Sequence, residues 1–568
     1  MKRFFTLALL FTFQLVVAFS ASIVWGYCDE GKSSYPNNTQ VGTYSAAICL
    51  GEVESYSYAG SEIKAVSLCL THNVTDLSVF VTTDLKDLSK AQVIGSATDG
   101  WHEYALNAPV KVNAGEKLYI GYTCTGSQPV CYSDQWNANG CWTKDGDGMW
   151  TDRANLGQYS VNSLSIRAKI ENANFLKDLA LVSLDEVEAS PRRTSTLTGK
   201  VKSTTPATVG NYELTVKLEG EVFTKETVTE TFNQAFQEKA FEIELPAVDE
   251  ALKSKLEVTI TAVNGAPDAA EGNNTQTCVY KNSRISYPRN VVVEEGTGTW
   301  CQYCVRGLVG MEYMANKYPD RFIGIGVHDN DAFAVNAYYG LIIGLGGLPS
   351  CKQNRLEKFD PASDTLEEQF NACGTRADGQ VTLLGAEYDD ATKSVTAYAN
   401  GRICYNIHKN ADYRIVFVVT ENGVPAMQSN AYSGGRYGPM GGFENKSNPC
   451  YVELPDVARA IAPTYLGKKG SMPAVLEVDK DYNYSCTFTL PSETGDRSKL
   501  TLIAMLLDGE TGEILNATKM PMNEAVVTGI ETSEVKKPSA KGAYDLSGRK
   551  VTDFKHGIVI VNGKKILK

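Results

Sequence analysis

The chain contains 568 residues and carries a formal net charge of −12, with charged side chains making up 21% of it. A chain of this length exceeds what one hydrophobic core supports, so we expect about three or four domains. The acidic balance argues against nucleic acid as a partner, because phosphate binding needs clustered lysine and arginine.

Residues 1–20 have the pattern of a secretory signal peptide. Lys2 and Arg3 precede an apolar run from Phe4 to Phe19, and Ala18-Phe19-Ser20 offers a small-x-small cleavage site. No later window of comparable length is apolar, so we expect no transmembrane helix in the mature chain. All 14 cysteines lie beyond this leader, an even number that fits disulfides in an oxidising compartment.

Residues 21–170 alternate apolar and polar positions between turns rich in Gly, Asn and Asp, which predicts a jelly-roll-like β-sandwich. The region resembles the carbohydrate-binding-like modules of secreted proteins. Surface glycans are therefore one candidate partner, through aromatic side chains that can stack on sugars. The four candidates are Trp101, Trp136, Trp142 and Trp150. The favoured alternative places these side chains in the core or in turns, because large aromatics are usually buried.

Asp145-Gly146-Asp147-Gly148 combines carboxylates and glycines in the way a calcium loop does. It lacks the downstream glutamate of such loops, so a hairpin turn is the favoured interpretation. Residues 171–284 repeat the strand alternation and contain one cysteine and no histidine, which predicts an immunoglobulin-like spacer without a site of its own.

The most informative chemistry lies between Val291 and Tyr318. An apolar strand runs through a glycine-rich turn into Trp-Cys-x-x-Cys, and helical spacing follows from Val305 onward. Strand, turn, cysteine and helix follow one another as in thioredoxin-like folds. The positive end of the helix stabilises a thiolate, so the pKa of Cys301 is expected to fall towards neutrality and Cys301 to act as nucleophile. Cys304, one turn later, can resolve a mixed disulfide formed at Cys301.

The run from Glu294 through Thr-Gly-Thr-Trp-Cys-x-x-Cys, followed by Gly310-Met311-Glu312, resembles the outer membrane protein 28-related family of type IX-secreting bacteria. The resemblance implies a thioredoxin-like α/β core over 285–380 and a β-rich part over 381–522. The strand pattern of that second part predicts that some strands complete the thioredoxin sheet and that the others form an appended β-sandwich. The resemblance also implies that Pro349 is a cis-proline facing the disulfide. Glu295 stands where such folds carry a buried acid that relays protons to the second cysteine.

The roles of three residues in this region are left open. Glu294 and Glu295 alternate along a strand, so one of them can be ordinary strand surface. His328 could join a cysteine and histidine metal site, but a single CxxC without a second ligand pair is a weak zinc signal. We expect His328 to be a strand-end residue near the site, and we expect no metal and no cofactor.

Pairings of the remaining cysteines follow from their positions and from the oxidising compartment. Cys351 can pair with Cys373 or serve as a third redox thiol, and the structural pairing is favoured. Further bridges are expected for Cys131 with Cys141 and for Cys404 with Cys486, and they are open among Cys28, Cys49, Cys69 and Cys124.

Residues 536–568 contain Ala543 to Val551 and Gly557 to Leu567, two strand patterns separated by turns. The segment resembles the carboxy-terminal sorting domain of type IX secretion cargo. That resemblance implies recognition by the type IX secretion machinery and an exported protein, located at the outer membrane, on the cell surface or in the medium. Valine and isoleucine interleave with the lysines, which argues against nucleic-acid binding.

Two functions follow from this sequence. The first is a thiol–disulfide oxidoreductase that acts on thiols or disulfides of exported proteins, with Cys301, Cys304, Pro349 and Glu295 as its site. The second is a surface binding or adhesion protein in which the CxxC pair is a structural disulfide. The motif favours the first function, and the number of β domains favours the second.

Overall fold

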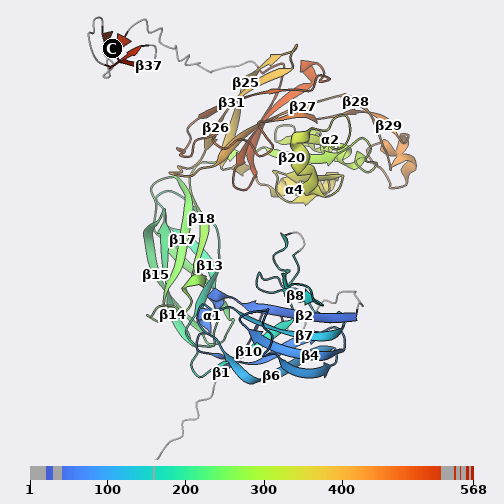
Figure 1. Ribbon diagram of the computed structural model, residues 1–568. Helices are drawn as coiled ribbons and strands as arrows, with labels where there is room; N and C mark the ends of the chain where they lie inside the picture. Colours follow the sequence, from blue (N-terminus) through green and yellow to red (C-terminus); the bar gives the residue numbers. More distant parts are fainter. Residues whose placement is uncertain are drawn as a thin grey trace, which may run out of the picture. The chain divides into compact units, whose positions relative to one another are not determined.

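The computed structural model describes residues 21–29, 41–157 and 160–525, together with four short strands between Ala543 and Leu567 (Figure 1). Contacts divide the chain into one unit of Met1–Asp249 and Lys253–Asn282 and another of Glu250–Leu252 and Ser283–Lys568. Both units are built mainly from β-sheets, so the predicted multidomain, mainly β class is confirmed. No helix among the described residues is long and apolar enough to cross a membrane.

The first unit begins with a β-sandwich whose two sheets enclose one apolar core. Ile48, Leu68 and Ile120 are fully buried between them, because alternate side chains of each strand point inward. One sheet has the order β1(Ala21–Gly26), β10(Ile166–Asn172), β3(Glu62–Leu70), β6(Gly100–Lys111). The other has the order β5(Gln92–Ala97), β4(Val74–Thr82), β7(Leu118–Ser127), β2(Val41–Leu50), β8(Trp142–Asp145), β9(Thr151–Asp152), and α1 covers Glu52–Ser57.

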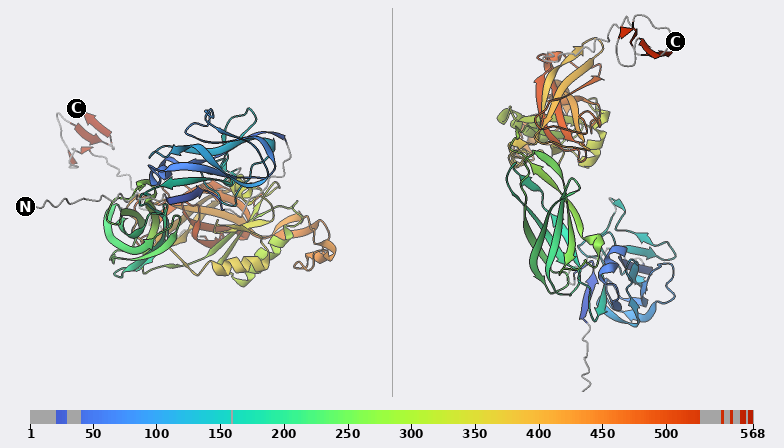
Figure 2. Two further views of the ribbon diagram at one scale, coloured as in Figure 1. Left: turned by 90° about the horizontal axis from the view of Figure 1, so that it is seen from below. Right: turned by 90° about the vertical axis from the view of Figure 1, so that its left-hand side faces the viewer.

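A second sandwich completes this unit and can be followed in green in Figure 2. Its core contains Leu214, Phe232 and Tyr280, all fully buried. One sheet has the order β11(Leu179–Leu184), β13(Ser195–Ser203), β16(Glu238–Leu245). The other has the order β12(Val187–Ala189), β18(Thr275–Asn282), β17(Leu252–Val263), β14(Val209–Leu218), β15(Glu221–Phe232).

The other unit is organised around one eight-stranded sheet. Its order is β23(Lys358–Phe359), β22(Ser350–Gln353), β20(Val291–Thr297), β21(Phe322–His328), β30(Val457–Ala462), β27(Tyr413–Glu421), β32(Leu500–Asp508), β33(Ile514–Pro521). β20, β21 and β30 run parallel, and the other neighbours are antiparallel. Strands from residues 285–380 and from residues 381–522 therefore form a single sheet.

Helices and a second sheet cover different parts of this sheet. α2(Val305–Lys317) and α4(Ser363–Ala372) pack on one face of β20 and β21 around Val293 and Phe322. α3(Tyr339–Leu345) packs on the opposite face around Val292 and Ile325. Further along, a sheet of order β25(Gly379–Asp389), β26(Ser394–Ile403), β31(Tyr482–Thr489) closes an apolar core against β27 and β32.

The remaining elements are short. β19(Tyr287–Pro288) pairs with β24(Arg376–Ala377), and β28(Val424–Gln428) pairs with β29(Cys450–Leu454). Single 3₁₀ turns lie at Glu271–Asn273, Asn336–Tyr338, Ser433–Gly435, Phe443–Asn445 and Arg497–Lys499. Near the end of the chain an antiparallel sheet has the order β35(Lys550–Val551), β34(Ala543–Tyr544), β36(Ile558–Val561), β37(Lys564–Leu567). The predicted signal peptide lies outside the described residues.

Candidate functional site

The CxxC motif lies in a turn between β20 and α2. Cys301 and Cys304 form a disulfide with a Cα–Cα distance of 5.4 Å. The turn, residues 298–304, is closed by backbone hydrogen bonds from Cys301 to Gly298 and from Cys304 to Cys301. Cys304 is the residue before the first helical position, so Cys301 stands one turn ahead of α2. Cys301 is 5% exposed and Cys304 is fully buried, which makes Cys301 the more accessible sulfur.

Glu295 lies on the α2 face of β20, because it alternates in phase with Val291 and Val293 of the core beneath that helix. Its side chain is 2% exposed, and Oε1 has no hydrogen-bond partner among the described residues. A Cβ on Gly307, in the first turn of α2, would come within 1.7 Å of that oxygen. The carboxyl group is therefore packed against the helix start, and burial raises the pKa of Glu295 to about 8.

Glu294 points to the opposite face of the sheet. Both of its oxygens accept hydrogen bonds of 2.9 Å from the guanidinium of Arg355, and both side chains are at most 3% exposed. The Arg355 guanidinium also stacks over the Tyr465 ring, 3.7 Å from its centroid. The interpretation that one of the two glutamates is ordinary strand surface is wrong, because helices cover both faces of β20.

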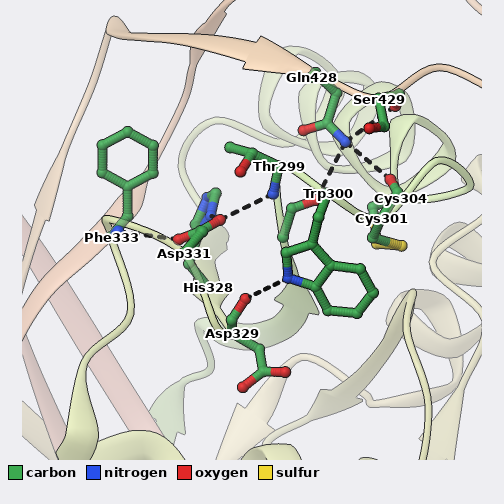
Figure 3. Close-up of polar contacts among 11 residues, drawn as sticks. Thr299, Trp300, Cys301, Cys304, His328, Asp329, Asp331, Phe333, Gln428 and Ser429 are labelled. Carbon is green, nitrogen blue, oxygen red and sulfur yellow. Dashed lines mark hydrogen bonds and ion pairs between the residues drawn. A yellow bond between two sulfur atoms is a disulfide. The ribbon is translucent and has the colours of Figure 1, made fainter. Parts of the chain in front are cut away.

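The turn is held from one side by residues that follow β21 (Figure 3). The Asp331 carboxylate accepts hydrogen bonds from the Thr299 N–H at 2.9 Å and contacts His328 Nδ1 at 2.7 Å. Burial alone would raise the pKa of Asp331, but these hydrogen bonds outweigh it and hold the pKa below its usual value. The Trp300 indole donates to the Asp329 carbonyl at 2.7 Å, and its ring remains half exposed (Figure 3).

From the other side the turn is held by the end of β28. The Gln428 side-chain amide donates to the carbonyl oxygens of Gly298 at 3.2 Å and Cys301 at 2.9 Å (Figure 3). Gln428 is 1% exposed, so these contacts are shielded from water. The sequence contains no local signal for this contact, because 127 positions separate Gln428 from Cys301.

The backbone after Gln428 continues the same arrangement. The N–H of Ser429 donates to the Thr299 carbonyl at 2.8 Å, and the N–H of Ala431 donates to the Gln302 carbonyl at 2.9 Å. We call residues 428–431 the clamp segment. The clamp segment thus contributes donors to four carbonyl groups between Gly298 and Gln302.

Pro349 lies in the loop between α3 and β22. The Leu348–Pro349 peptide bond is cis, the isomer that the resemblance implies. Ser350, the next residue, pairs with Gly296 of β20, five residues before Cys301. Leu348 Cδ2 also lies 2.8 Å from the place a Cβ on Gly296 would take. The proline is therefore attached to the same strand that leads into the CxxC turn.

The disulfides predicted elsewhere are not formed. The Cys351 thiol instead contacts the Phe359 carbonyl at 3.5 Å, and the Cys373 sulfur accepts a hydrogen bond from Asn354 at 3.1 Å. Cys404 and Cys486 are likewise free thiols, as is Cys141, which excludes its predicted bridge to Cys131. Burial raises the pKa of Cys141 to about 12 and that of Cys404 to about 11. These thiols pack as small apolar side chains in their cores.

The four tryptophans considered as glycan-stacking residues contact other side chains or the backbone. Trp142 and Trp150 make edge-to-face contacts with Tyr119 and Phe80, and Trp101 lies under the Arg167 guanidinium. Trp136 is 58% exposed, and its indole N–H donates to the Ala154 carbonyl. The Asp145–Gly148 stretch connects paired strands β8 and β9, as the hairpin interpretation predicts.

The sequence predicted Cys301, Cys304, Glu295 and Pro349 as site residues, and it did not predict the residues that contact them or their neighbours in the structure. Gly307 could have been suspected, since glycine destabilises a helix and its presence in one often reflects close packing at that position. The contributions of Arg355, Asp331 and Gln428 depend on contacts between distant segments. No local pattern marks them.

Comparisons with known proteins found distant structural similarity. No family model matches the chain, and no curated protein does. HBP35 of Porphyromonas gingivalis is 18% identical with a TM-score of 0.30, covering 50% of this chain and 98% of that one. A domain of the outer membrane lipoprotein Omp28 from Porphyromonas gingivalis is 14% identical with a TM-score of 0.15, covering 26% and 88%. At these values the function must be argued from the site itself.

Proposed function

We propose that the protein is a thiol–disulfide oxidoreductase acting on thiols or disulfides of exported proteins. The observation that carries this proposal is the position of Glu295, a buried carboxyl group without a counter-charge, packed against the helix that follows the CxxC disulfide. A fold tolerates such a group at a cost of several kcal/mol, so its presence against the first turn of the helix that follows the disulfide favours a chemical role.

The exchange runs through a mixed disulfide at Cys301. A substrate thiolate attacks the Cys301 sulfur, the Cys301–Cys304 bond breaks, and Cys304 leaves as a thiolate. A second substrate thiolate then attacks the substrate sulfur of the mixed disulfide and releases the Cys301 thiolate. The substrate gains a disulfide, and its two electrons remain on the CxxC pair. The reverse sequence reduces a substrate disulfide.

Glu295 supplies or accepts the proton at Cys304. Its pKa of about 8 keeps the carboxyl group protonated near neutral pH, so it can protonate the leaving Cys304 thiolate. In the reverse direction the carboxylate takes the proton back and restores the Cys304 nucleophile. Gln cannot exchange a proton in this way, so Glu295→Gln should slow the steps in which Cys304 leaves or attacks. It should leave intact the attack of the Cys301 thiolate on a substrate disulfide.

A second function is supported by the low exposure of the sulfurs. With Cys301 5% exposed and Cys304 fully buried, the pair could serve as a structural disulfide in a surface binding protein. Structural disulfides have reduction potentials below about −300 mV and exchange negligibly with glutathione. The two functions therefore predict opposite redox behaviour.

Equilibration with glutathione redox buffers, followed by mass spectrometry of the Cys301–Cys304 peptide, separates the two functions. We expect the pair to equilibrate at a potential above about −300 mV. A Cys304→Ser variant should trap mixed disulfides through Cys301 in cells, and the matched Cys301→Ser variant should trap far fewer because Cys304 is buried. A pair that resists glutathione, together with no trapped partner, would establish the binding function instead.

We also propose that the protein is exported to the cell surface or the medium by type IX secretion. The support is the signal-peptide pattern of residues 1–20 and the sorting-domain resemblance of residues 536–568. Mass spectrometry of exported protein should find an amino terminus near Ala21 and no residues after about Lys536. Intact termini on exported protein would refute this route.

A further inference from the structure

The clamp segment, residues 428–431, covers the acceptor groups of the CxxC turn. Its donors reach four carbonyl groups, two through the Gln428 amide and two through backbone N–H groups. These carbonyls belong to Gly298, Thr299, Cys301 and Gln302. Within the described part of the chain, the Gly298 and Cys301 carbonyls also accept hydrogen bonds from N–H groups of the turn itself, whereas the Thr299 and Gln302 carbonyls accept theirs from the clamp segment.

The clamp segment is itself held firmly. The Asn430 side chain donates to the Phe443 carbonyl at 2.8 Å, and the Asn430 N–H donates to the Asn448 side chain at 2.8 Å. Apolar side chains of β28, β29 and the loop between them pack with Val305, the first residue of α2. Donors fixed in this way act as preorganised dipoles and not as mobile side chains.

Carbonyl oxygens carry partial negative charge, so uncovered carbonyls beside a sulfur disfavour its anionic form. An N–H group that donates to such a carbonyl offsets the negative charge of the oxygen and brings the positive end of a dipole close to it. Electrostatic interactions of this kind are stronger at a site shielded from water. A neutral disulfide responds weakly to these dipoles, whereas a thiolate at Cys301 responds strongly. The clamp segment therefore discriminates between the two redox states of the pair.

We propose that Gln428, with the clamp segment that it begins, is a positioning residue of the redox site, which holds the CxxC turn in one shape and favours the thiolate form of reduced Cys301. This inference rests on the proposed oxidoreductase function and identifies the segment that tunes the redox behaviour of the CxxC pair. It predicts that the clamp segment makes the disulfide easier to reduce, because it stabilises the reduced state more than the oxidised state.

The test measures the thiolate of Cys301 directly. Full-length protein carrying Cys304→Ser is reduced, and labelling of the Cys301 peptide by iodoacetamide is followed by mass spectrometry from about pH 5 to pH 10. Adding Gln428→Leu removes one donor group, and we expect the thiolate fraction below the pKa to fall roughly three- to tenfold. With Cys304 present, the same change should make the disulfide harder to reduce by glutathione by a similar factor.

A second variant and a matched control complete the test. Gln428→Glu keeps the shape but places a carboxylate against the carbonyls, so its thiolate fraction should fall at least as far. Gln353→Leu removes another buried glutamine, whose amide donates to the Gln369 carbonyl at 2.9 Å, and it should leave the labelling profile unchanged. Should Gln428→Leu fail to fold, Gln428→Glu decides the question.

The outcomes for the clamp segment and for the redox function are distinct. An unchanged pH profile in either folded Gln428 variant, or an equal shift in Gln353→Leu, would overturn the inference about the clamp segment. Absence of glutathione exchange in the unmodified protein would overturn the oxidoreductase function alone. The labelling measurement starts from chemically reduced protein and does not depend on that exchange.

Discussion

Glu294 and Glu295 are adjacent in β20, both are buried, and their surroundings differ completely. Glu294 receives two hydrogen bonds from Arg355 on the α3 face of the sheet. Glu295, on the α2 face, has an Oε1 without a hydrogen-bond partner in the described part of the chain, and burial raises its pKa to about 8. One carboxylate is thus neutralised by a buried cation, and the other remains neutral near pH 7 by keeping its proton.

The comparison teaches that burial alone does not identify a functional carboxyl group. A buried ion pair fixes geometry and has no proton to exchange near neutral pH. A buried carboxyl group without a counter-charge titrates in the range where thiol exchange operates. The asymmetry follows from alternation along one strand, since successive side chains face different layers.

The largest effect should come from breaking the ion pair. Arg355→Met leaves Glu294 buried without its partner, and we expect a loss of about 3–5 kcal/mol in the free energy of unfolding at pH 7. Urea denaturation measures this loss. The double variant Glu294→Leu/Arg355→Met should recover most of the stability, and failure to recover it would show that Arg355 acts through other contacts.

The second prediction replaces Glu295 with a residue that does not titrate. The folded pKa of Glu295, about 8, lies above the usual value of 4.5, so the folded state binds the extra proton and stability declines as pH rises between these values. Glu295→Gln should therefore match the parent near pH 4.5 and exceed it by about 3–5 kcal/mol above pH 8. Urea denaturation across this pH range gives the difference. A constant difference would contradict a neutral Glu295.

A smaller effect should come from filling the space beside Glu295. Gly307→Ala places a Cβ within 1.7 Å of Glu295 Oε1, and the overpacking should cost about 1–3 kcal/mol by thermal or urea unfolding. Gly344→Ala is the matched control, because it lies in α3 with open space around it and should be neutral or stabilising. Combining Gly307→Ala with Glu295→Ala should abolish the cost. If the double variant is still destabilised, the added methyl group clashes with a residue other than Glu295.

The smallest effect concerns a third carboxyl group, Asp331, which is satisfied by hydrogen bonds. Its pKa is held below 3.8, so its contribution is present above that pH and lost as pH falls through the folded pKa. Asp331→Asn should cost about 1–2 kcal/mol at pH 7 and less in acid, measured by urea unfolding. Asp329→Asn is the control, because Asp329 holds Trp300 through its backbone carbonyl. Equal losses would remove the role assigned to the Asp331 carboxylate.

Some parts of the site could be predicted because they are local. Cys301 and Cys304 share one turn, and the strand before them and the helix after them follow from side-chain periodicity. The disulfide pairings at Cys351, Cys404 and Cys141 could not be predicted in this way. Each depends on which sulfur the fold brings within bonding distance, and here packing gave these thiols other neighbours.

The sequence by itself determined the strand–turn–helix unit around the CxxC motif, the alternation that sends Glu294 and Glu295 to different faces, and the mainly β character of the flanking domains. Only the tertiary structure decided that Arg355 neutralises one glutamate, that Gly307 packs against the other, and that Gln428 covers the CxxC turn. The physical reason is sequence distance. Periodicity and turn chemistry act over a few residues, whereas charge compensation and donor placement depend on segments that meet only when the sheet has formed.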